Sequence, residues 1–114
     1  MSFEVQELQL SAAWCPILYA ELDKKTVVYH LINGKTIEAS TIRTGFSEAV
    51  QELLQDNRFT MCGTSMAVNL YYIHIVDHDT LVFTNSQKAY IGRRASRELR
   101  SVWSDFWMNR EGIK

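Results

Sequence analysis

The sequence predicts a mostly β fold, built from antiparallel strands with one internal helix and one C-terminal helix. Short β-branched and aromatic runs alternate with turn residues through most of the chain, which is typical of strands. The apolar spacing changes to that of a helix only twice, near the middle of the chain and at its end. With 114 residues, 46% hydrophobic and 22% charged, the chain fits one globular domain over residues 1–114.

The first half is expected to open as a meander of three antiparallel strands. They are predicted over residues 17–22, 26–32 and 35–42, and a polar turn at residues 23–25 joins the first two. Asn33-Gly34 is the strongest two-residue hairpin signal, because both residues tolerate a positive φ. In the third strand Ile37 and Ala39 alternate with Glu38, so that one face is apolar.

An amphipathic helix follows the meander. Its stripe consists of apolar residues at helical spacing, Phe46, Ala49, Val50, Leu53 and Leu54. Thr44 is the expected N-cap, and Glu48 stands in the first turn, where a negative charge is favourable. Asp56-Asn57 is expected to end this helix.

The second half is predicted to return to strands and then to close with a helix. Strands are expected over residues 58–61, 67–70, 72–76, 81–83 and 89–91, separated by polar loops at residues 62–65, 77–79 and 85–88. From Arg93 onward one helical stripe is apolar, with Ala95, Leu99, Val102, Trp103 and Phe106. The opposite face carries Arg93, Arg94, Arg97 and Arg100.

The net charge of −1 averages an acidic and a basic half. Residues 1–57 carry four basic and eight acidic side chains, whereas residues 58–114 carry eight basic and five acidic ones. Between Lys88 and Arg100 five basic side chains stand against one acid, Glu98. Clustered cations at a helix start suit phosphate contacts. A solvated helix face supported by an Arg94–Glu98 pair explains the same pattern.

Several other function classes find little support. Cys15 and Cys62 are too few for a disulfide framework, which favours a cytosolic protein, and no apolar run is long enough for membrane insertion. No cofactor motif and no catalytic residues are identified. His74 and His78 lack further ligands at a recognisable metal-site spacing. A Cys62–His30 catalytic pair stays an open alternative to a buried Cys62 that packs as a small hydrophobe.

The derived order of elements resembles the LytTR family of bacterial DNA-binding domains over about residues 15–106. Three groups of residues carry the resemblance. They are Ile17 to Glu21 in the opening strand, the central group Phe59, Ser65, Val68, Asn69 and Ile73, and Arg93-Arg94 with Leu99 in the closing helix.

The resemblance implies a transcription regulator that binds duplex DNA through loops inserted in the major groove, with two copies on repeated half-sites, as a homodimer or with a partner regulator. Family members usually follow a receiver domain, and a chain that starts at Met1 leaves no room for one, so we expect a standalone regulator or an excised domain. The implied DNA-binding residues are Lys24, Lys25, Thr64, Ser65, Arg93, Arg94 and Arg97. Asn85 is instead expected to be a turn residue with a left-handed backbone, and Asn69 to cap local backbone.

The chain departs from the family in its central motif, which commonly reads Phe-x-Arg-x-His-Arg/Lys-Ser. Met61, Gly63 and Thr64 replace the Arg, the His and the second basic residue, and Gly92 replaces the usual Ser before the Arg pair. Because Arg and Lys are the commonest readers of guanine, Thr64 implies a weaker and less selective base contact. A degenerate LytTR-like protein interaction module is therefore the alternative function, with Trp107 and Met108 as its contact surface.

Overall fold

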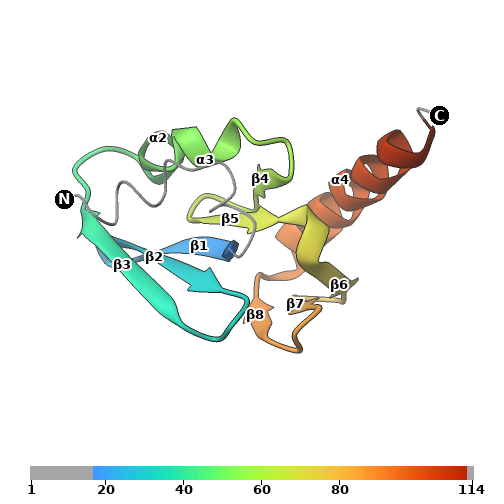
Figure 1. The fold of residues 1–114 in the computed structure, drawn as a ribbon, viewed down its shortest axis with the longest axis horizontal. Helices are drawn as coiled ribbons and strands as arrows, with labels where there is room; N and C mark the ends of the chain where they lie inside the picture. Colours follow the sequence, from blue (N-terminus) through green and yellow to red (C-terminus); the bar gives the residue numbers. More distant parts are fainter. Residues whose placement is uncertain (1–16, 113–114) are drawn as a thin grey trace.

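The chain folds around two antiparallel sheets, seen in the computed structural model, which describes residues 17–112 (Figure 1). The larger sheet has five strands in the order β3-β2-β1-β5-β4. Its strands are β1 (Ile17–Asp23), β2 (Thr26–Leu31), β3 (Thr36–Thr41), β4 (Phe59–Met61) and β5 (Met66–Asn69). The predicted meander is confirmed as β1, β2 and β3, and β5 pairs with the free side of β1.

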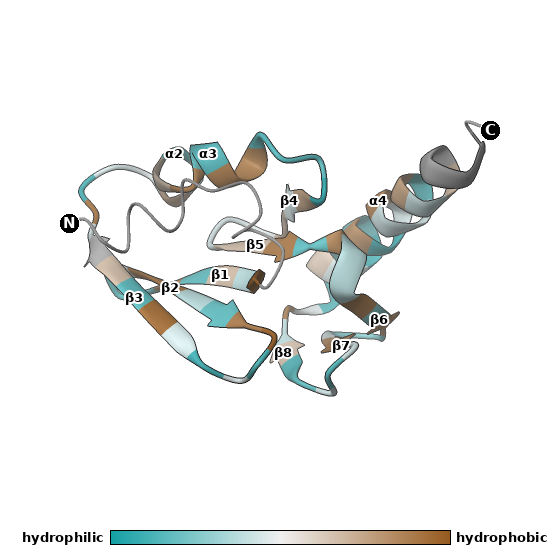
Figure 2. Cartoon of the chain, viewed as in Figure 1, coloured by the Kyte–Doolittle hydropathy of each residue, from teal (hydrophilic) through white to brown (hydrophobic). Residues whose placement is uncertain are grey.

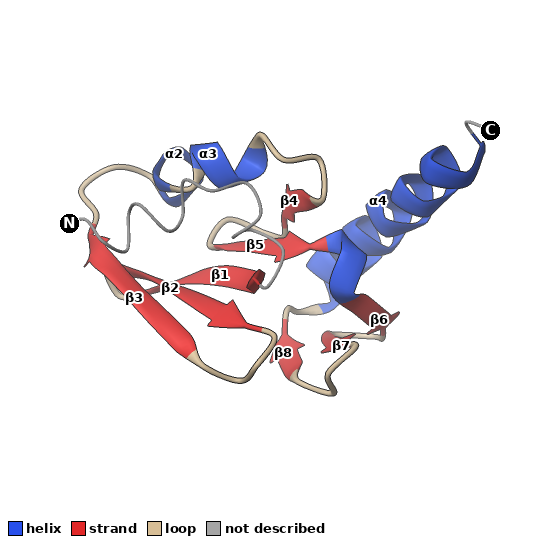
Figure 3. Cartoon of the chain, in the orientation of Figure 1, coloured by secondary structure: helices blue, strands red, loops and turns tan. Residues whose placement is uncertain are grey.

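The smaller sheet has three strands, and the long C-terminal helix follows it. The strands are β6 (Ile73–Val76), β7 (Thr80–Phe83) and β8 (Lys88–Tyr90), in that spatial order. A short 3₁₀ helix, η2 (Leu70–Tyr72), links the two sheets, and two residues separate β8 from α4 (Arg93–Gly112). Figure 3 shows α4 projecting from one end of the molecule, and the predicted mostly β class with a terminal helix is confirmed.

Two buried clusters cover the two faces of the larger sheet. On one face Ala20, Val27 and Phe59 pack with Phe46 and Leu53 of the internal helical segment. On the other, residues of β1 and β5 pack with the smaller sheet and α4, with Leu18, Val68, Leu81, Phe83 and Leu99 among the buried side chains. Because both of its faces are covered, the five-stranded sheet is a rigid layer that holds the β1–β2 hairpin and the β4–β5 turn.

The internal helix differs from the prediction. It consists of two single-turn helices, α2 (Phe46–Ala49) and α3 (Gln51–Leu54), with Val50 between them at φ −107° and ψ 23°. The N-cap is Gly45 rather than Thr44, whose hydroxyl donates to the Gly45 carbonyl oxygen at 3.4 Å. The predicted apolar stripe itself is correct, because Val50 is still buried. The polar loop that follows α3 and leads to β4 is coloured teal in Figure 2.

Three local expectations are also corrected. The hairpin at Asn33-Gly34 has three loop residues, because the Leu31 N–H donates to the Lys35 carbonyl at 2.9 Å and Gly34 has φ +89°. In the β7–β8 turn the left-handed residue is Ser86, at φ +76°, whereas the Asn85 side-chain amide donates to the Ile32 carbonyl at 2.8 Å. Val102, expected in the core stripe of α4, is 39% exposed, whereas Trp103 and Phe106 of the same stripe pack against the core, so Val102 lies at the edge of the buried face.

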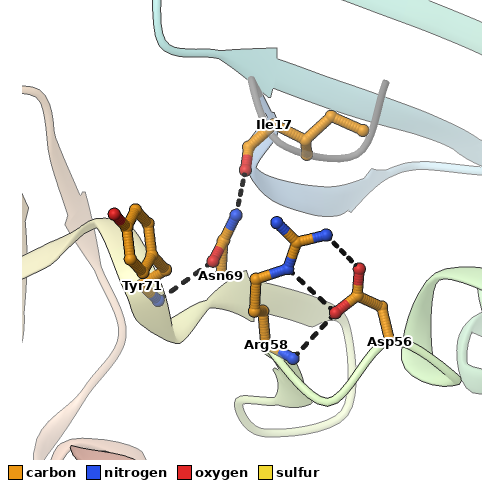
Figure 4. A network of polar contacts seen from close by, with 5 residues as sticks. All are labelled: Ile17, Asp56, Arg58, Asn69 and Tyr71. Carbon is orange, nitrogen blue, oxygen red and sulfur yellow. Dashed lines mark hydrogen bonds and ion pairs between the residues drawn. The ribbon is translucent and has the colours of Figure 1, made fainter. Parts of the chain in front are cut away.

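Asn69 fixes the junction between the two sheets, as shown in Figure 4. Its side chain is fully buried, donates to the Ile17 carbonyl at 2.9 Å and accepts from the Tyr71 N–H at 3.0 Å. The capping role predicted for Asn69 is therefore confirmed, and the residue also ties β1 to the start of η2. These bonds satisfy backbone groups that would otherwise be costly to bury.

Candidate nucleic-acid interface

Lys24 and Lys25 form the tip of the β1–β2 hairpin. The last pair of the ladder, Asp23 with Thr26, leaves only these two residues in the turn. Lys24 adopts φ +62°, a backbone conformation that is strained for any residue with a Cβ atom. Both lysines are exposed. The turn therefore presents two cations to solvent, as the sequence predicts.

The β4–β5 turn lies beside the hairpin tip. The Cys62 N–H donates to the Met66 carbonyl at 2.8 Å and closes a tight loop, in which Gly63 takes φ +74°. The Leu22 N–H donates to the Ser65 carbonyl at 3.0 Å, next to the Glu21–Met66 pair of β1 and β5. Thr64 and Ser65 are exposed. This backbone bond brings two segments that are far apart in sequence to the same end of the sheet.

The start of α4 is fixed by backbone geometry. The Asp79 carbonyl accepts from the Ile91 N–H at 2.8 Å and from the Gly92 N–H at 3.1 Å. Gly92 has φ +86°, and its carbonyl accepts the first helical bond, from the Ser96 N–H at 3.0 Å. The first turn of α4 has no acidic residue, so the positive end of the helix dipole and the two leading arginines reinforce each other.

An open groove of about 680 Å³ joins the β4–β5 turn to the start of α4. Its walls include Gly63 and Thr64 on one side and Arg93 and Arg94 on the other. Two of the three segments implied by the resemblance therefore share one groove. A backbone or base edge lying in it would meet a small hydroxyl side chain and two guanidinium groups.

Arg94 also makes the ion pair that the sequence offers as the alternative explanation for this charge cluster. Its Nε lies 3.8 Å from the Glu98 Oε2, and both side chains are largely exposed. Such a solvated pair contributes about 0.5 kcal/mol at most and is easily exchanged for a phosphate contact. Glu98 also lines the groove, where it lowers the positive potential that Arg94 creates.

The hairpin lysines line a separate groove of about 480 Å³, on the side of the hairpin that faces the loop after β3. Arg43 lines the same groove and is exposed, giving it a third cation. The Ile42 N–H donates to the Lys25 carbonyl at 2.8 Å and holds this loop against the hairpin. Nothing in the local sequence marks Arg43, because the contact depends on the pairing of β2 with β3.

Arg97 does not join the groove that contains Thr64. Four residues beyond Arg93 on a helix, it lies on the side of α4 that faces the β6–β7 turn. The four arginines predicted on one solvent-facing side are thus divided, with Arg94 in the first groove, Arg97 and Arg100 in another, and Arg93 lining both.

The environment of the Cys62 thiol does not activate it as a nucleophile. Cys62 is buried and forms no disulfide, and burial, with a smaller contribution from Glu98, raises the pKa of its thiol to about 11. A catalytic cysteine needs the opposite shift. His30 instead contacts Glu21, with Nε2 and Oε2 2.7 Å apart, and stacks on Tyr19. The buried hydrophobe predicted at Cys62 is confirmed, and Cys15 lies outside the described residues.

Neither a metal site nor a membrane span is found in the described part of the chain. Within residues 17–112 no three His, Cys, Asp or Glu side chains gather as a metal-binding group. No helix in the same range is both long and apolar enough to span a membrane.

Comparison with known proteins agrees with the architecture. A family model described as LytTr DNA-binding domain matches residues 12–104. Among solved structures, the chain is similar to the LytTr DNA-binding domain of a protein from Bacillus cereus described as a methyl-accepting/DNA response regulator. The TM-score is 0.59 at 18% sequence identity, covering 78% of this chain and 82% of that chain, and at this identity the likeness shows the fold alone. No curated protein matches the chain significantly. Because the family model matches most of the sequence and the fold agrees, the chain belongs to the LytTR family of DNA-binding domains.

Proposed function

We propose that this chain is a transcription regulator that binds duplex DNA through its loops, with no catalytic step and no cofactor. The proposed contact residues are those implied by the resemblance, Lys24, Lys25, Thr64, Ser65, Arg93, Arg94 and Arg97. In this proposal two copies occupy repeated half-sites, as a homodimer or with a related regulator.

The groove between the β4–β5 turn and α4 is the observation that carries the proposal. It places Thr64 opposite Arg93 and Arg94, and the bond between Leu22 and Ser65 adds the lysine hairpin to the same end of the sheet. Cations from separate segments supply phosphate contacts that fix the orientation of the duplex. Short loops beside them are then held close enough to reach base edges.

The proposed base reading is weaker than that of the usual family motif. With Met61 and Gly63 in the β4–β5 segment, that turn offers the hydroxyl groups of Thr64 and Ser65 and no guanidinium or imidazole group. A hydroxyl can bond to any of several bases, whereas a bidentate arginine selects guanine. We therefore expect affinity to come mainly from phosphates, and sequence preference to be modest.

An unbiased selection of duplex oligonucleotides by the purified chain tests this proposal. The expected product is a short motif that occurs twice at a fixed spacing. A matched selection with the Arg93→Ala/Arg94→Ala double variant should recover no enriched motif. Enrichment of the same motif by this variant, or of none by the unmodified chain, would refute the proposal.

A protein interaction module is the second candidate function, and the C-terminal part of α4 favours it. Met108 is 64% exposed and Val102 is 39% exposed, while Trp107 packs on Tyr71 with ring centroids 5.9 Å apart. Exposed Met beside aromatic rings is enriched in interfaces. In this reading a related regulator or sensor, or a second copy of the chain, docks on the helix.

Light scattering of the chain and of Met108→Asp distinguishes the two candidates. An interaction module should associate in the absence of DNA, and the charge on the helix should abolish that association. Ser47→Asp is the matched control, because Ser47 is exposed on α2 rather than on α4 and the substitution adds the same charge. Equal association of all three chains would remove this surface from the account.

A further inference from the structure

A second groove on α4 is lined mainly by arginine side chains. It encloses about 220 Å³ between the helix and the β6–β7 turn. Arg93, Arg97 and Arg100 contribute from the helix, and His78 contributes from the turn. Their spacing places the three arginines on one helix face, about 10 Å from first to last at 1.5 Å per residue.

Hydrogen bonds hold the two walls of this groove together. The Ser96 hydroxyl donates to the Asp77 carbonyl, and the Arg100 Nη2 donates to the Val76 carbonyl at 3.1 Å. Ser96 is buried, and it lies at the floor between the helix and the turn. The Arg100 bond uses one of the five N–H donors of a guanidinium group, so the others can still reach a ligand.

The acidic residues of the turn do not line the groove. The Asp77 Oδ1 accepts from the His78 N–H at 2.8 Å, and the Asp79 Oδ1 accepts from the Thr80 hydroxyl at 2.9 Å. Both carboxylates are thus bonded to groups of their own turn. The Ser96 hydroxyl is already bonded to the Asp77 carbonyl, so the groups left to face a ligand are three guanidinium groups and an imidazole. These suit a phosphate group with several acceptor oxygens.

We propose that this groove binds a backbone phosphodiester of the DNA that flanks the base-contacting loops. The proposal rests on the proposed function and extends it to two further residues, Arg100 and His78. Arg93 lines both grooves, so a strand leaving the groove of Thr64 can continue along the arginine face of α4. Phosphate contacts of this kind position the duplex without reading its sequence.

Fluorescence anisotropy with two duplexes tests this proposal. One duplex carries the selected site with mixed-sequence flanks, and the other is trimmed to the site itself. The unmodified chain should bind the flanked duplex several-fold more tightly. Arg100→Gln should remove part of that advantage, lower the slope of log K against log salt by about 0.9 on the flanked duplex, and leave binding of the trimmed duplex unaffected. Arg97→Gln, at a residue that already belongs to the proposed contact set, should weaken binding of the flanked duplex more than binding of the trimmed one.

Lys35→Gln is the charge-matched control, because Lys35 is exposed in the β2–β3 turn, at the opposite end of β2 from the lysine hairpin. It should leave both affinities unchanged. Thermal melting of Arg100→Gln identifies any loss of folding caused by the missing bond to Val76. If Arg100→Gln is destabilised, the comparison of the two duplexes with Arg97→Gln tests the proposal.

The outcomes separate this proposal from the one on which it rests. Equal binding of both duplexes by the unmodified chain, or an equal loss on both in the arginine variants, would overturn the flank contact while DNA binding stands. Binding of neither duplex would overturn both proposals. Saturable shifts of His78 in NMR spectra on titration with inorganic phosphate, combined with no flank effect, would assign the groove to a free anion instead.

Discussion

Lys24 shows how one residue can be unfavourable for folding and favourable for binding. Its φ of +62° suits glycine, yet the position carries a long cationic side chain. Strain that the rest of the fold tolerates is often found at functional positions. The adjacent Lys25 has no positive φ, so the two lysines share charge and exposure and differ in backbone strain.

Replacing Lys24 by glycine should therefore have opposite effects on stability and on DNA affinity. We expect Lys24→Gly to raise the free energy of unfolding by about 0.5 kcal/mol in urea titrations, since the strain is relieved. Affinity for DNA should fall, with a salt slope reduced by about 1. Lys25→Gly should lower both quantities, and a gain of stability there would contradict this account of the turn.

Asp56 provides a pH-dependent contribution to the fold. Its carboxylate accepts from the Arg58 backbone N–H and from the Arg58 Nε, each at 3.0 Å, and forms an ion pair with the same guanidinium (Figure 4). The side-chain hydrogen bond to Arg58 is the main cause that lowers the pKa of Asp56, while partial burial acts in the opposite direction. A lowered folded-state pKa stabilises the fold at neutral pH.

Asp56→Asn should therefore destabilise the protein in a pH-dependent manner. The amide oxygen can still accept from the Arg58 N–H, so the variant removes mainly the charge. We expect a loss of about 1 kcal/mol at neutral pH. The difference should be complete above the unfolded aspartate pKa of about 4 and should shrink as pH falls through the lower folded value. A constant difference from pH 7 to pH 2 in urea titrations would refute this.

At the scale of elements, the strands follow local pattern more closely than the internal helix. Alternation of Ile37 and Ala39 places β3 correctly, because a half-buried strand needs only that period. The stripe from Phe46 to Leu54 finds the buried face of the helix, but the break at Val50 carries no local mark. Val50 remains buried at the break, so the apolar period continues through it and does not reveal it.

Gly92 sets the start of α4 and with it the direction of Arg93 and Arg94. No atom lies within 4 Å of a Cβ built at Gly92, so a side chain fits there, but φ is +86°. Gly92→Ser, which restores the residue usual in the family, should lower the free energy of unfolding by about 1 kcal/mol, because only glycine adopts this φ freely.

Gly92→Ser should also weaken DNA binding, because the strain that serine introduces at this φ shifts the first turn of α4. Gly45→Ser is the matched control, because Gly45 has φ −66° and its Cβ position is equally open. It should leave DNA binding unchanged and should not lower stability, because serine is a favoured N-cap residue at this ordinary φ. Unaltered stability of Gly92→Ser in thermal unfolding would contradict the role given to this glycine.

At the scale of the whole molecule, the sequence predicts the class of fold and the segments of the interface, but not how the segments assemble. Lys24, Thr64 and Arg94 each lie in a turn or helix start that local residues identify. Their proximity depends on the pairing of β1 with β5, and the division of the arginines depends on where α4 crosses the smaller sheet. Arg43 and Arg100 were missed for the same reason, since their neighbours are remote in sequence.

The net charge of the whole molecule also affects how it binds DNA. The net charge of −1 gives little long-range attraction for DNA, so binding must rely on the cations gathered around the grooves. We therefore expect weak non-specific affinity and a strong response to the loss of one or two well-placed arginines.

The salt dependence of binding to the selected duplex tests the central claim most directly. Anisotropy titrations between about 50 and 200 mM salt would compare the unmodified chain with Arg93→Ala/Arg94→Ala and with Lys35→Gln. Over this range the affinity that comes from phosphate contacts depends strongly on salt. We predict a steep linear fall of log K for the unmodified chain and for Lys35→Gln, and a slope smaller by about 2 for the arginine variant. Identical slopes and affinities for all three folded chains would contradict the assignment of the groove between the β4–β5 turn and α4 to DNA.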